Sequence, residues 1–262
     1  MHNEVAFPLH AARGAAYLTA PNIAARHAFS TRLGGVSTGV LESLNLSVRR
    51  GDTPENVREN WRRLGAAAGL DLTRAVYARQ IHSADVRIAQ PPEREPRFAC
   101  DGFVTNEPGV PLAVFMADCL PVLLHDPAAG VIGAVHCGWR GSVADILGAA
   151  VAQMCAIGAH PADIRAAIGP GIGACCFEVG PEVVAAAEAL LHEPLGALVR
   201  PRADGKALLD LKGVNARRLV QLGVPAGQIA VSDACTMCRP DVFWSHRATD
   251  GRRGVQAAVI TL

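Results

Sequence analysis

Residues 113–141, AVFMADCLPVLLHDPAAGVIGAVHCGWRG, contain two short apolar runs that each end beside a chemically versatile side chain. The run over 113–117 leads to Cys119, and the run over 131–135 leads to His136. Short apolar runs bounded by turn residues are typical of buried strands. The ends of buried strands hold side chains on a rigid frame, which suits reactive groups. This stretch therefore predicts two strands, each presenting a candidate functional residue.

A third apolar run, over 75–81, ends in the same way at His82 in the segment QIHSADV. Two imidazoles and one thiolate suit Zn²⁺, and three protein ligands leave its fourth position open, as in catalytic zinc sites. Such a metal ion lowers the pKa of its water, which becomes a nucleophile near neutral pH. We therefore expect His82, Cys119 and His136 to converge on one metal site. The alternative is that each is a structural core residue, because the three form no short ligand pattern.

The neighbours of these three residues have weaker claims to a function. Asp118 either hydrogen-bonds a ligand histidine and fixes its tautomer, or is a turn residue. Cys137 should point to the opposite face from His136 if the strand continues, so it is not counted as a ligand. Arg32, in a glycine-rich loop, and Arg140, at a predicted helix N-terminus, are candidates for holding an anion. The alternative for both is a solvated or salt-bridged arginine.

The remaining cysteine motif is a lone CxxC, Cys235–Cys238. A zinc ribbon needs a second such pair, but Cys175 and Cys176 are adjacent instead of two apart. The sequence therefore predicts a structural role for this CxxC. The chain also lacks a P-loop, an HExxH motif and the HxE…PCxxC pattern of nucleobase deaminases.

Composition excludes several classes of protein. The chain has 262 residues, half of them hydrophobic, and a net charge of +1 with scattered arginine pairs, which argues against a nucleic-acid surface. No segment reaches the roughly 18 apolar residues of a membrane helix, and the start, MHNEVAFPLH, is unlike a signal peptide. Eight cysteines without a secretory signal indicate reduced thiols. We expect a cytoplasmic protein that binds neither nucleic acid nor a membrane; its oligomeric state stays open.

Caps and periodicity place the secondary structure. Thr53, Pro54 and Gly69 mark the two ends of one helix, and Ser142 with Asp145 forms a capping-box pattern at the start of another. We also predict helices over 181–192 and between 210 and 223, an exposed loop over 90–98, and strands over 15–18, 75–81, 84–89, 229–232, at the start of 164–180 and at the C-terminal end. Without a regular βαβ rhythm, this order predicts an α+β fold with mixed sheets.

Seven motifs follow one another in the order of a known family: STRLGG (30–35), SLNLSVRRGD (43–52), QIHSADV (80–86), ADCLPVLLHD (117–126), AVHCGWRG (134–141), AIGPGIGACCFEVG (167–180) and CTMC…FWSHR (235–247). Together they resemble the bacterial YfiH-like family, also described as laccase-domain or polyphenol oxidase proteins and as purine nucleoside phosphorylases. The resemblance runs from about residue 28 to the C-terminus. It implies a single domain over residues 1–262, with mixed β-sheets packed face to face and helices on the outside.

The resemblance also implies a zinc site formed by His82, Cys119 and His136, with copper as the alternative metal. It implies phosphorolysis of adenosine, inosine and methylthioadenosine, with adenosine deamination as a second activity. Purine nucleosides and phosphate are then the expected partners, and Arg32 and Arg140 are the candidates for holding phosphate.

Three other functions stay open. Cys119 as nucleophile with His136 as base would give a cysteine amidohydrolase, as for peptidoglycan-precursor editing. Copper-dependent phenol oxidation has little support, because a multicopper site needs paired histidine clusters and the nine histidines include no HxH pair. A zinc ion closed by a fourth protein ligand would act as a clamp in a non-enzymatic protein. The chain also departs from the family at Ser83, Cys137 and His246, where Gly, Ala and Tyr are common.

Overall fold

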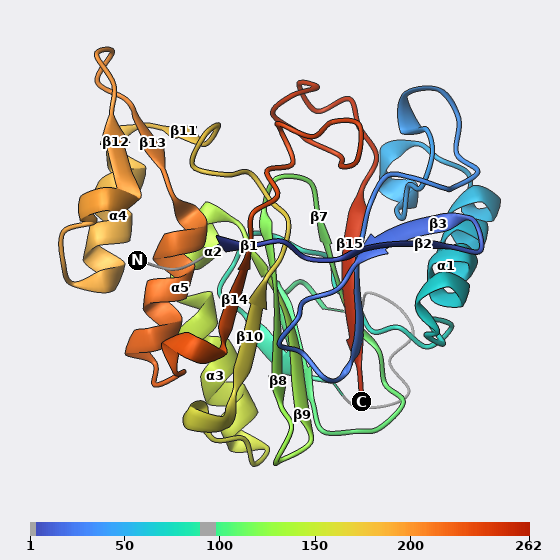
Figure 1. Ribbon diagram of the computed structural model, residues 1–262, viewed down its shortest axis with the longest axis horizontal. Coiled ribbons are helices and arrows are strands. Elements are labelled where there is room, and N and C mark those ends of the chain that lie inside the picture. Colours follow the sequence, from blue (N-terminus) through green and yellow to red (C-terminus); the bar gives the residue numbers. More distant parts are fainter. Residues whose placement is uncertain (1–3, 90–97) are drawn as a thin grey trace.

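The strands form three sheets in the computed structural model, which describes residues 4–89 and 98–262 (Figure 1). The seven strands of the largest sheet are, in spatial order, β1 (Glu4–Val5), β14 (Ile229–Ser232), β10 (Arg165–Ile168), β8 (Leu120–Asp126), β9 (Val131–Cys137), β6 (Gly102–Thr105) and β5 (Val86–Ile88). This sheet is mixed: β10, β8, β9 and β6 pair antiparallel, whereas β14 is parallel to β10 and β1, and β5 is parallel to β6.

The second sheet has five strands and is antiparallel throughout. Its strands are, in spatial order, β2 (Leu9–Ala12), β3 (Ala15–Leu18), β4 (Arg26–Ser30), β15 (Gln256–Thr261) and β7 (Leu112–Met116). A small third sheet consists of β11 (Glu178–Val179), β13 (Ala207–Leu209) and β12 (Val199–Pro201). The α-helices are α1 (Pro54–Ala68), α2 (Trp139–Val143), α3 (Ile146–Ala156), α4 (Pro181–Leu191) and α5 (Leu211–Gln221).

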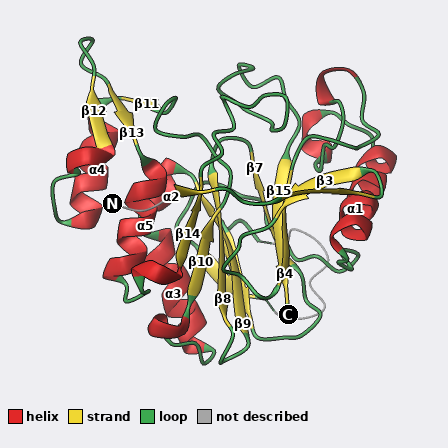
Figure 2. Ribbon diagram, in the orientation of Figure 1, coloured by secondary structure: helices red, strands yellow, loops and turns green. Residues whose placement is uncertain are grey.

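The two large sheets pack face to face, with helices on the outer faces (Figure 2). Phe29 of β4 and Ile260 of β15 share one hydrophobic cluster with Leu123 of β8 and Ile132 of β9. On the far side of the five-stranded sheet, β15 and β4 pack with Leu64 of α1. The layers therefore run helices, seven-stranded sheet, five-stranded sheet, helix. This arrangement confirms the predicted α+β fold with mixed sheets in one domain.

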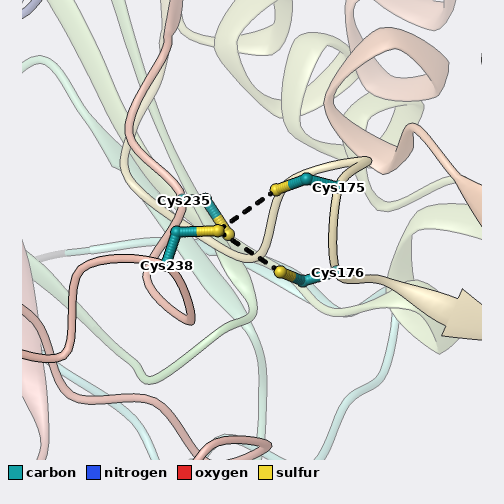
Figure 3. A group of neighbouring side chains, drawn as sticks. All are labelled: Cys175, Cys176, Cys235 and Cys238. Carbon is teal, nitrogen blue, oxygen red and sulfur yellow. Dashed lines mark hydrogen bonds between the residues drawn. The ribbon is translucent and has the colours of Figure 1, made fainter.

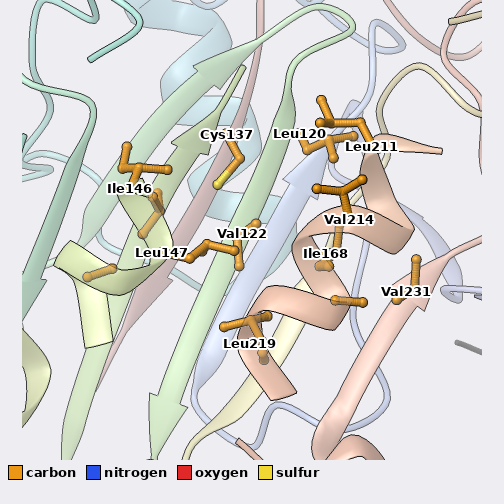
Figure 4. Packing of buried hydrophobic residues seen from close by; sticks show 14 of the residues in the cluster. Leu120, Val122, Cys137, Ile146, Leu147, Ile168, Leu211, Val214, Leu219 and Val231 are labelled. Atoms are coloured by element: carbon orange, nitrogen blue, oxygen red, sulfur yellow. The ribbon is translucent and has the colours of Figure 1, made fainter. Parts of the chain in front are cut away.

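The helix-covered face of the seven-stranded sheet forms its own core (Figure 4). Val122 of β8 lies there with Leu147 of α3 and Leu219 of α5. Because side chains alternate along a strand, Cys137 of β9 also faces these helices, while His136 points toward the space between the sheets. The prediction that Cys137 points away from His136 is confirmed. The sheet thus separates the buried thiol from the face that carries the imidazole.

The predicted caps of α1 are confirmed, but those of the next helix are wrong. Thr53 Oγ1 accepts a hydrogen bond from the N–H of Asn56, and Gly69 ends α1 with φ 68°. The chain after Gly138 breaks into α2 and α3, because Asp145 takes the left-handed conformation (φ 66°) and caps α3 by accepting from the N–H of Gly148. The helix expected from Ser142 is therefore two helices.

Other predicted elements differ in extent. Residues 75–81 form no strand but only a single bridge between Val76 and Leu112. Strand β8 was not expected, although it lies between the two predicted strands and pairs with both β9 and β10. Most of the loop predicted over 90–98 lies outside the described residues. Within residues 4–89 and 98–262, no helix has the length and apolar character needed to cross a membrane.

Candidate active site

The three predicted ligands come from three different parts of the chain and meet where β9 ends and β8 begins, in the middle of the seven-stranded sheet. His136 lies near the end of β9, Cys119 lies just before β8, and His82 lies on the loop before β5. The register of the sheet places His136 opposite Pro121, two residues from Cys119. One ligand atom from each residue lies within 4.8 Å of the other two. The structure therefore brings His82, Cys119 and His136 together.

The donor set fits a zinc ion. Nε2 of His82 lies 3.9 Å from Sγ of Cys119, and the two imidazole rings are 4.9 Å apart at 77°. Nitrogen and sulfur bound to one tetrahedral zinc ion are separated by about 3.6 Å. A movement of either side chain by a few tenths of an ångström would therefore bring both atoms to bonding distance from one zinc ion. His136 is buried and His82 is exposed, which leaves one side of the group open. Across residues 4–89 and 98–262, no fourth His, Cys, Asp or Glu joins this group.

Asp101 organises the group from behind. Its carboxylate is fully buried, and Oδ1 lies 2.9 Å from Nδ1 of His136, which leaves Nε2 of that ring for a metal. The same carboxylate accepts hydrogen bonds from the N–H groups of Ile81, His82 and Ser83 and from the Ser83 hydroxyl. Burial alone would raise the pKa of Asp101, but His136 and Ser83 hold it well below its usual range. One carboxylate thus orients two of the three ligands.

Of the two alternatives for Asp118, the structure supports the turn residue, because its carboxylate binds partners other than a histidine. Oδ1 of Asp118 accepts a hydrogen bond from Thr236 Oγ1 at 2.7 Å, and Oδ2 accepts from the N–H of Arg247 at 2.7 Å. These bonds join the turn before Cys119 to the segment 236–247. Asp118 therefore fixes the Cys119 turn to a distant part of the chain instead of fixing a histidine tautomer.

Close packing around the ligands requires glycine in the GWRG turn. A Cβ added to Gly138 would lie 2.9 Å from Cδ2 of His82 and 3.2 Å from Sγ of Cys119. A Cβ at Gly141 would lie 2.7 Å from the carbonyl oxygen of Ser83. Any larger residue at these positions would push the His82 loop away from the other two ligands.

Mutual ionisation shifts the pKa values of Cys119 and His136. Burial opposes the charged form of both groups, but the charge of each favours ionisation of the other. The His136 and His82 imidazoles lower the pKa of the Cys119 thiol to about 6. Cys119 and Asp101 raise the pKa of His136 to about 9. Each group therefore favours the charged form of the other, and a thiolate is the form of cysteine that binds metal.

A cavity of about 580 Å³ opens onto this group, a size typical of small-molecule sites. His82, Cys119 and His136 all line it. An aromatic cluster of Trp61, Tyr77 and Phe115 lines another part, with ring centroids 5.4–6.4 Å apart. The arginines that line it are Arg49, Arg50, Arg58 and Arg253. The cavity thus combines a group of side chains that could hold a metal ion, aromatic surfaces and positive charge.

Among these arginines, Arg253 is the best candidate for binding an anion. Its Nε is buried and has no hydrogen-bond partner, while Nη1 donates to the carbonyl of Gly254. Burial, together with the nearby charge of Arg50, lowers the pKa of Arg253 to about 10. Buried guanidinium groups are normally paired. An anion bound beside Arg253 and Arg50 would supply that missing partner.

Arg32 and Arg140 do not line this cavity. The Arg32 guanidinium donates to the carbonyls of Glu42 and Pro240 and lies 4.0 Å from the ring centroid of Trp244. The Arg140 guanidinium lies 4.3 Å from the ring centroid of Trp139. Sequence reasoning instead missed Asp101 and Arg253. The available signal for Asp101 was a lone Asp within an apolar segment, since a buried carboxylate needs partners. The sequence held no signal for Arg253, because its contacts depend on the fold.

Comparison with known proteins agrees with the fold and the motifs. The sequence model described as "Multi-copper polyphenol oxidoreductase laccase" matches residues 26–262. A protein of Deinococcus radiodurans named purine nucleoside phosphorylase is 44% identical over 251 residues, covering 96% of this chain and 94% of that protein. A protein named adenosine deaminase RL5, from an unknown prokaryotic organism, is 38% identical over 229 residues, covering 84% and 87%.

Solved structures of similar proteins have the same fold as this chain. The crystal structure of YlmD from Geobacillus stearothermophilus superposes with a TM-score of 0.88 at 36% identity, covering 97% of this chain and 98% of that one. The crystal structure of a YfiH protein from Bacillus licheniformis gives 0.87 at 33% identity, covering 96% and 97%. By its motifs, its fold and these matches, the chain belongs to the YfiH-like family of laccase-domain proteins.

Proposed function

We propose that this protein is a zinc-dependent purine nucleoside phosphorylase that acts on adenosine, inosine and methylthioadenosine and also deaminates adenosine. The chain is an enzyme of its family, and relatives carry the names purine nucleoside phosphorylase and adenosine deaminase. The observation that carries the proposal is one cavity that joins the His82, Cys119 and His136 group to aromatic surfaces and to arginines. Nucleoside recognition needs the aromatic surfaces, and phosphate recognition needs the arginines.

The metal proposed for the site is zinc, with copper as the alternative. A zinc ion held by His82, Cys119 and His136 would supply a Lewis acid and a water molecule that is nucleophilic near neutral pH. In deamination the oxygen of water forms a bond to C6 of adenine and the amino group leaves as ammonia, so this chemistry fits. Asp101 contributes by holding Nδ1 of His136, and the exposed side of His82 gives the substrate access.

Phosphorolysis places different demands on the cavity. A phosphate oxygen forms a bond to C1′ of the ribose while the bond from C1′ to the purine nitrogen breaks, and the purine leaves. The guanidinium groups of Arg253 and Arg50 would hold the phosphate and balance its charge. Trp61 and Phe115 offer aromatic faces on which a purine could stack. The phosphate-binding roles of Arg32 and Arg140 remain proposals, and the lining of the cavity favours Arg50 and Arg253.

The test is incubation of the purified protein with adenosine, with and without phosphate, followed by product analysis. Adenine and ribose 1-phosphate that form only with phosphate would support phosphorolysis, and inosine formed without phosphate would support deamination. Arg253→Met should raise the KM for phosphate, whereas Arg252→Met should not, because Arg252 is exposed and does not line the cavity. Absence of both products with zinc-loaded protein would refute the proposal.

One observation favours a second candidate, a cysteine amidohydrolase. Cys119 and His136 each favour the charged form of the other, as the thiol and imidazole of cysteine hydrolases do. A thiolate bound to zinc is not free to attack an amide, so the two functions respond oppositely to chelation. Amidase activity on peptidoglycan precursors that survives removal of the metal would favour the thiol. Loss of phosphorolysis on chelation and its return with zinc would favour the metal.

Two further alternatives have less support. A zinc clamp would need a fourth protein ligand, and the described part of the chain offers no His, Cys, Asp or Glu for that position. Multicopper oxidation would need several histidine clusters, whereas His82, Cys119 and His136 make the only histidine-containing group found in residues 4–89 and 98–262. We also propose a cytoplasmic location, since all eight cysteines are free.

A further inference from the structure

Four cysteines from two distant segments meet outside the cavity (Figure 3). Cys175 and Cys176 lie in the turn between β10 and β11, and Cys235 and Cys238 lie in the segment after β14. The four sulfur atoms all lie within 4.8 Å of one another. Cys238 is central, with its Sγ 3.5 Å from that of Cys175 and 3.4 Å from that of Cys176. Cys175 and Cys176 have the wrong spacing for a second CxxC motif, but in the structure they lie beside Cys235 and Cys238.

We propose that Cys175, Cys176, Cys235 and Cys238 form a second metal site, which binds one Zn²⁺ tetrahedrally through four thiolates. Sulfur atoms bound to one tetrahedral zinc ion are separated by about 3.8 Å, close to the observed distances. Each cysteine is free, and the sulfurs are too far apart for disulfides, whose S–S bond is about 2.05 Å. Four protein ligands close the coordination shell, which is the arrangement of structural zinc sites.

The backbone around the four thiols is arranged for this role. The N–H of Gly173 donates to Sγ of Cys235 at 3.2 Å, a bond that stabilises a thiolate. Gly171 and Cys235 pair as a parallel bridge, and the N–H of Thr236 donates to the carbonyl of Gly171. A Cβ at Gly173 would lie 3.2 Å from Cβ of Cys235. The two segments therefore approach closely and are joined independently of any metal.

A buried cation offsets the negative charge of such a site. Zn²⁺ with four thiolates carries a net charge of −2. The ammonium group of Lys212 is buried, donates to the carbonyls of Ser232 and Ala234, and interacts electrostatically with Cys235. A lysine with this burial needs negative partners nearby. Glu4, Asp210 and Asp233 already interact electrostatically with this lysine, and the four-cysteine site would add negative charge beside it; Lys212 in turn fixes the residues that precede Cys235.

The position of this second site links it to the cavity. Thr236, next to Cys235, donates its hydroxyl to Asp118, which precedes Cys119. The segment that begins at Cys235 continues through Arg247, also bound to Asp118, to Arg253 in the cavity wall. Metal in the four-cysteine site would therefore hold one wall of the cavity against the seven-stranded sheet. We assign it a structural role, because no open coordination position faces the cavity.

The test counts metal in protein purified under reducing conditions and reconstituted with Zn²⁺. We expect two zinc ions per chain in the wild type, one in Cys238→Ser and one in Cys119→Ala. The matched control Cys155→Ser should keep two, because Cys155 is exposed and belongs to neither group. Co²⁺ loaded into Cys119→Ala should give intense thiolate-to-cobalt absorption, since all remaining thiolate ligands belong to the four-cysteine site.

The Cys119→Ala measurement keeps the proposal testable even if Cys238→Ser fails to fold. It also separates the two metal sites, because the catalytic group contributes at most one thiolate. One zinc ion per wild-type chain, together with none in Cys119→Ala, would overturn the proposal. So would a disulfide among the four cysteines that persists through reduction and leaves no thiolate absorption with Co²⁺. Loss of phosphorolysis with both zinc ions retained would count against the proposed function alone.

Discussion

Replacing Asp101 with Asn tests whether this carboxylate holds the metal group together. Oδ1 accepts from the N–H of His82 and pairs with Nδ1 of His136, and Oδ2 accepts from Ile81 and twice from Ser83. The amide of asparagine has only one acceptor oxygen. In the lowest-energy placement this oxygen occupies the position of Oδ2 and keeps its three hydrogen bonds. The NH₂ group then faces the N–H of His82 and Nδ1 of His136. Hydrogen bonds to charged groups contribute about 1.5–3 kcal/mol each, so losing two costs about 3–6 kcal/mol.

This cost should divide between metal binding and folding. Loss of a residue that orients a metal ligand typically weakens affinity by about 10–100-fold, or about 1.4–2.8 kcal/mol. The remainder, about 2–3 kcal/mol, should appear as a lower free energy of unfolding of the metal-free protein. Competition with a chromophoric chelator measures the zinc affinity, and urea denaturation measures the stability.

The matched control is Asp85→Asn, which removes an exposed ion pair with Arg87 in the same region. Surface pairs of this kind contribute at most about 1 kcal/mol, so this variant should resemble the wild type in both assays. If Asp101→Asn bound zinc within twofold of the wild type and unfolded at the same urea concentration, the role assigned to Asp101 would be refuted.

Three further predictions concern the ligands, a buried carboxylate and the cavity arginine. His82→Ala, Cys119→Ala and His136→Ala should each abolish phosphorolysis and deamination and release one zinc ion, measured by product analysis and metal content; an active, zinc-replete variant would contradict this. Buried Asp126 accepts from three backbone N–H groups, which, against the opposing effect of burial, lower its pKa. Asp126→Ala should therefore lower the free energy of unfolding by about 3 kcal/mol at pH 7. This difference from the wild type should shrink as pH falls below about 4, where the carboxyl group of the unfolded protein is protonated. A difference that does not change with pH would refute this role of Asp126. Arg253→Met should raise the KM for phosphate more than tenfold, about 1.4 kcal/mol, and should lower the free energy of unfolding by about 1 kcal/mol, because the bond from Nη1 to the carbonyl of Gly254 is lost while Nε has no partner to lose; unchanged phosphate kinetics would exclude the role.

Local signals in the sequence were sufficient for some elements. The cap at Thr53 and the left-handed end at Gly69 each depend on a few neighbouring residues, so the ends of α1 were predictable. Cys119 and His136 were identified from the apolar runs before them, but those runs form β7 and β9, which belong to different sheets; the two residues meet because β8, which begins just after Cys119, pairs with β9. The strand expected before His82 does not form, yet His82 reaches the site because Asp101 holds its loop.

Two of the misses depend on contact between segments far apart in the sequence, and the third depends on a local backbone conformation. Strand β8 was missed because its proline and its Asp126 terminus obscure an alternation that only pairing with β9 and β10 reveals. Cys175 and Cys176 had the wrong spacing for a ligand pair, but their turn supplies both sulfurs to the CxxC. Asp145 was read as part of a capping box, whereas its left-handed backbone places the cap of a new helix there.

The central position of β15 affects how the chain can fold as it is made. Ala258 of β15 pairs with Phe29 of β4 on one side and with Val114 of β7 on the other. Of the described strands, β15 is the last in sequence, so a ribosome has synthesised both neighbours long before the strand that joins them. Until β15 emerges, the nascent chain exposes two unpaired strand edges and their apolar faces. The second sheet therefore cannot be completed before residues 256–261 have been synthesised, and chaperones that shield such edges should improve the yield.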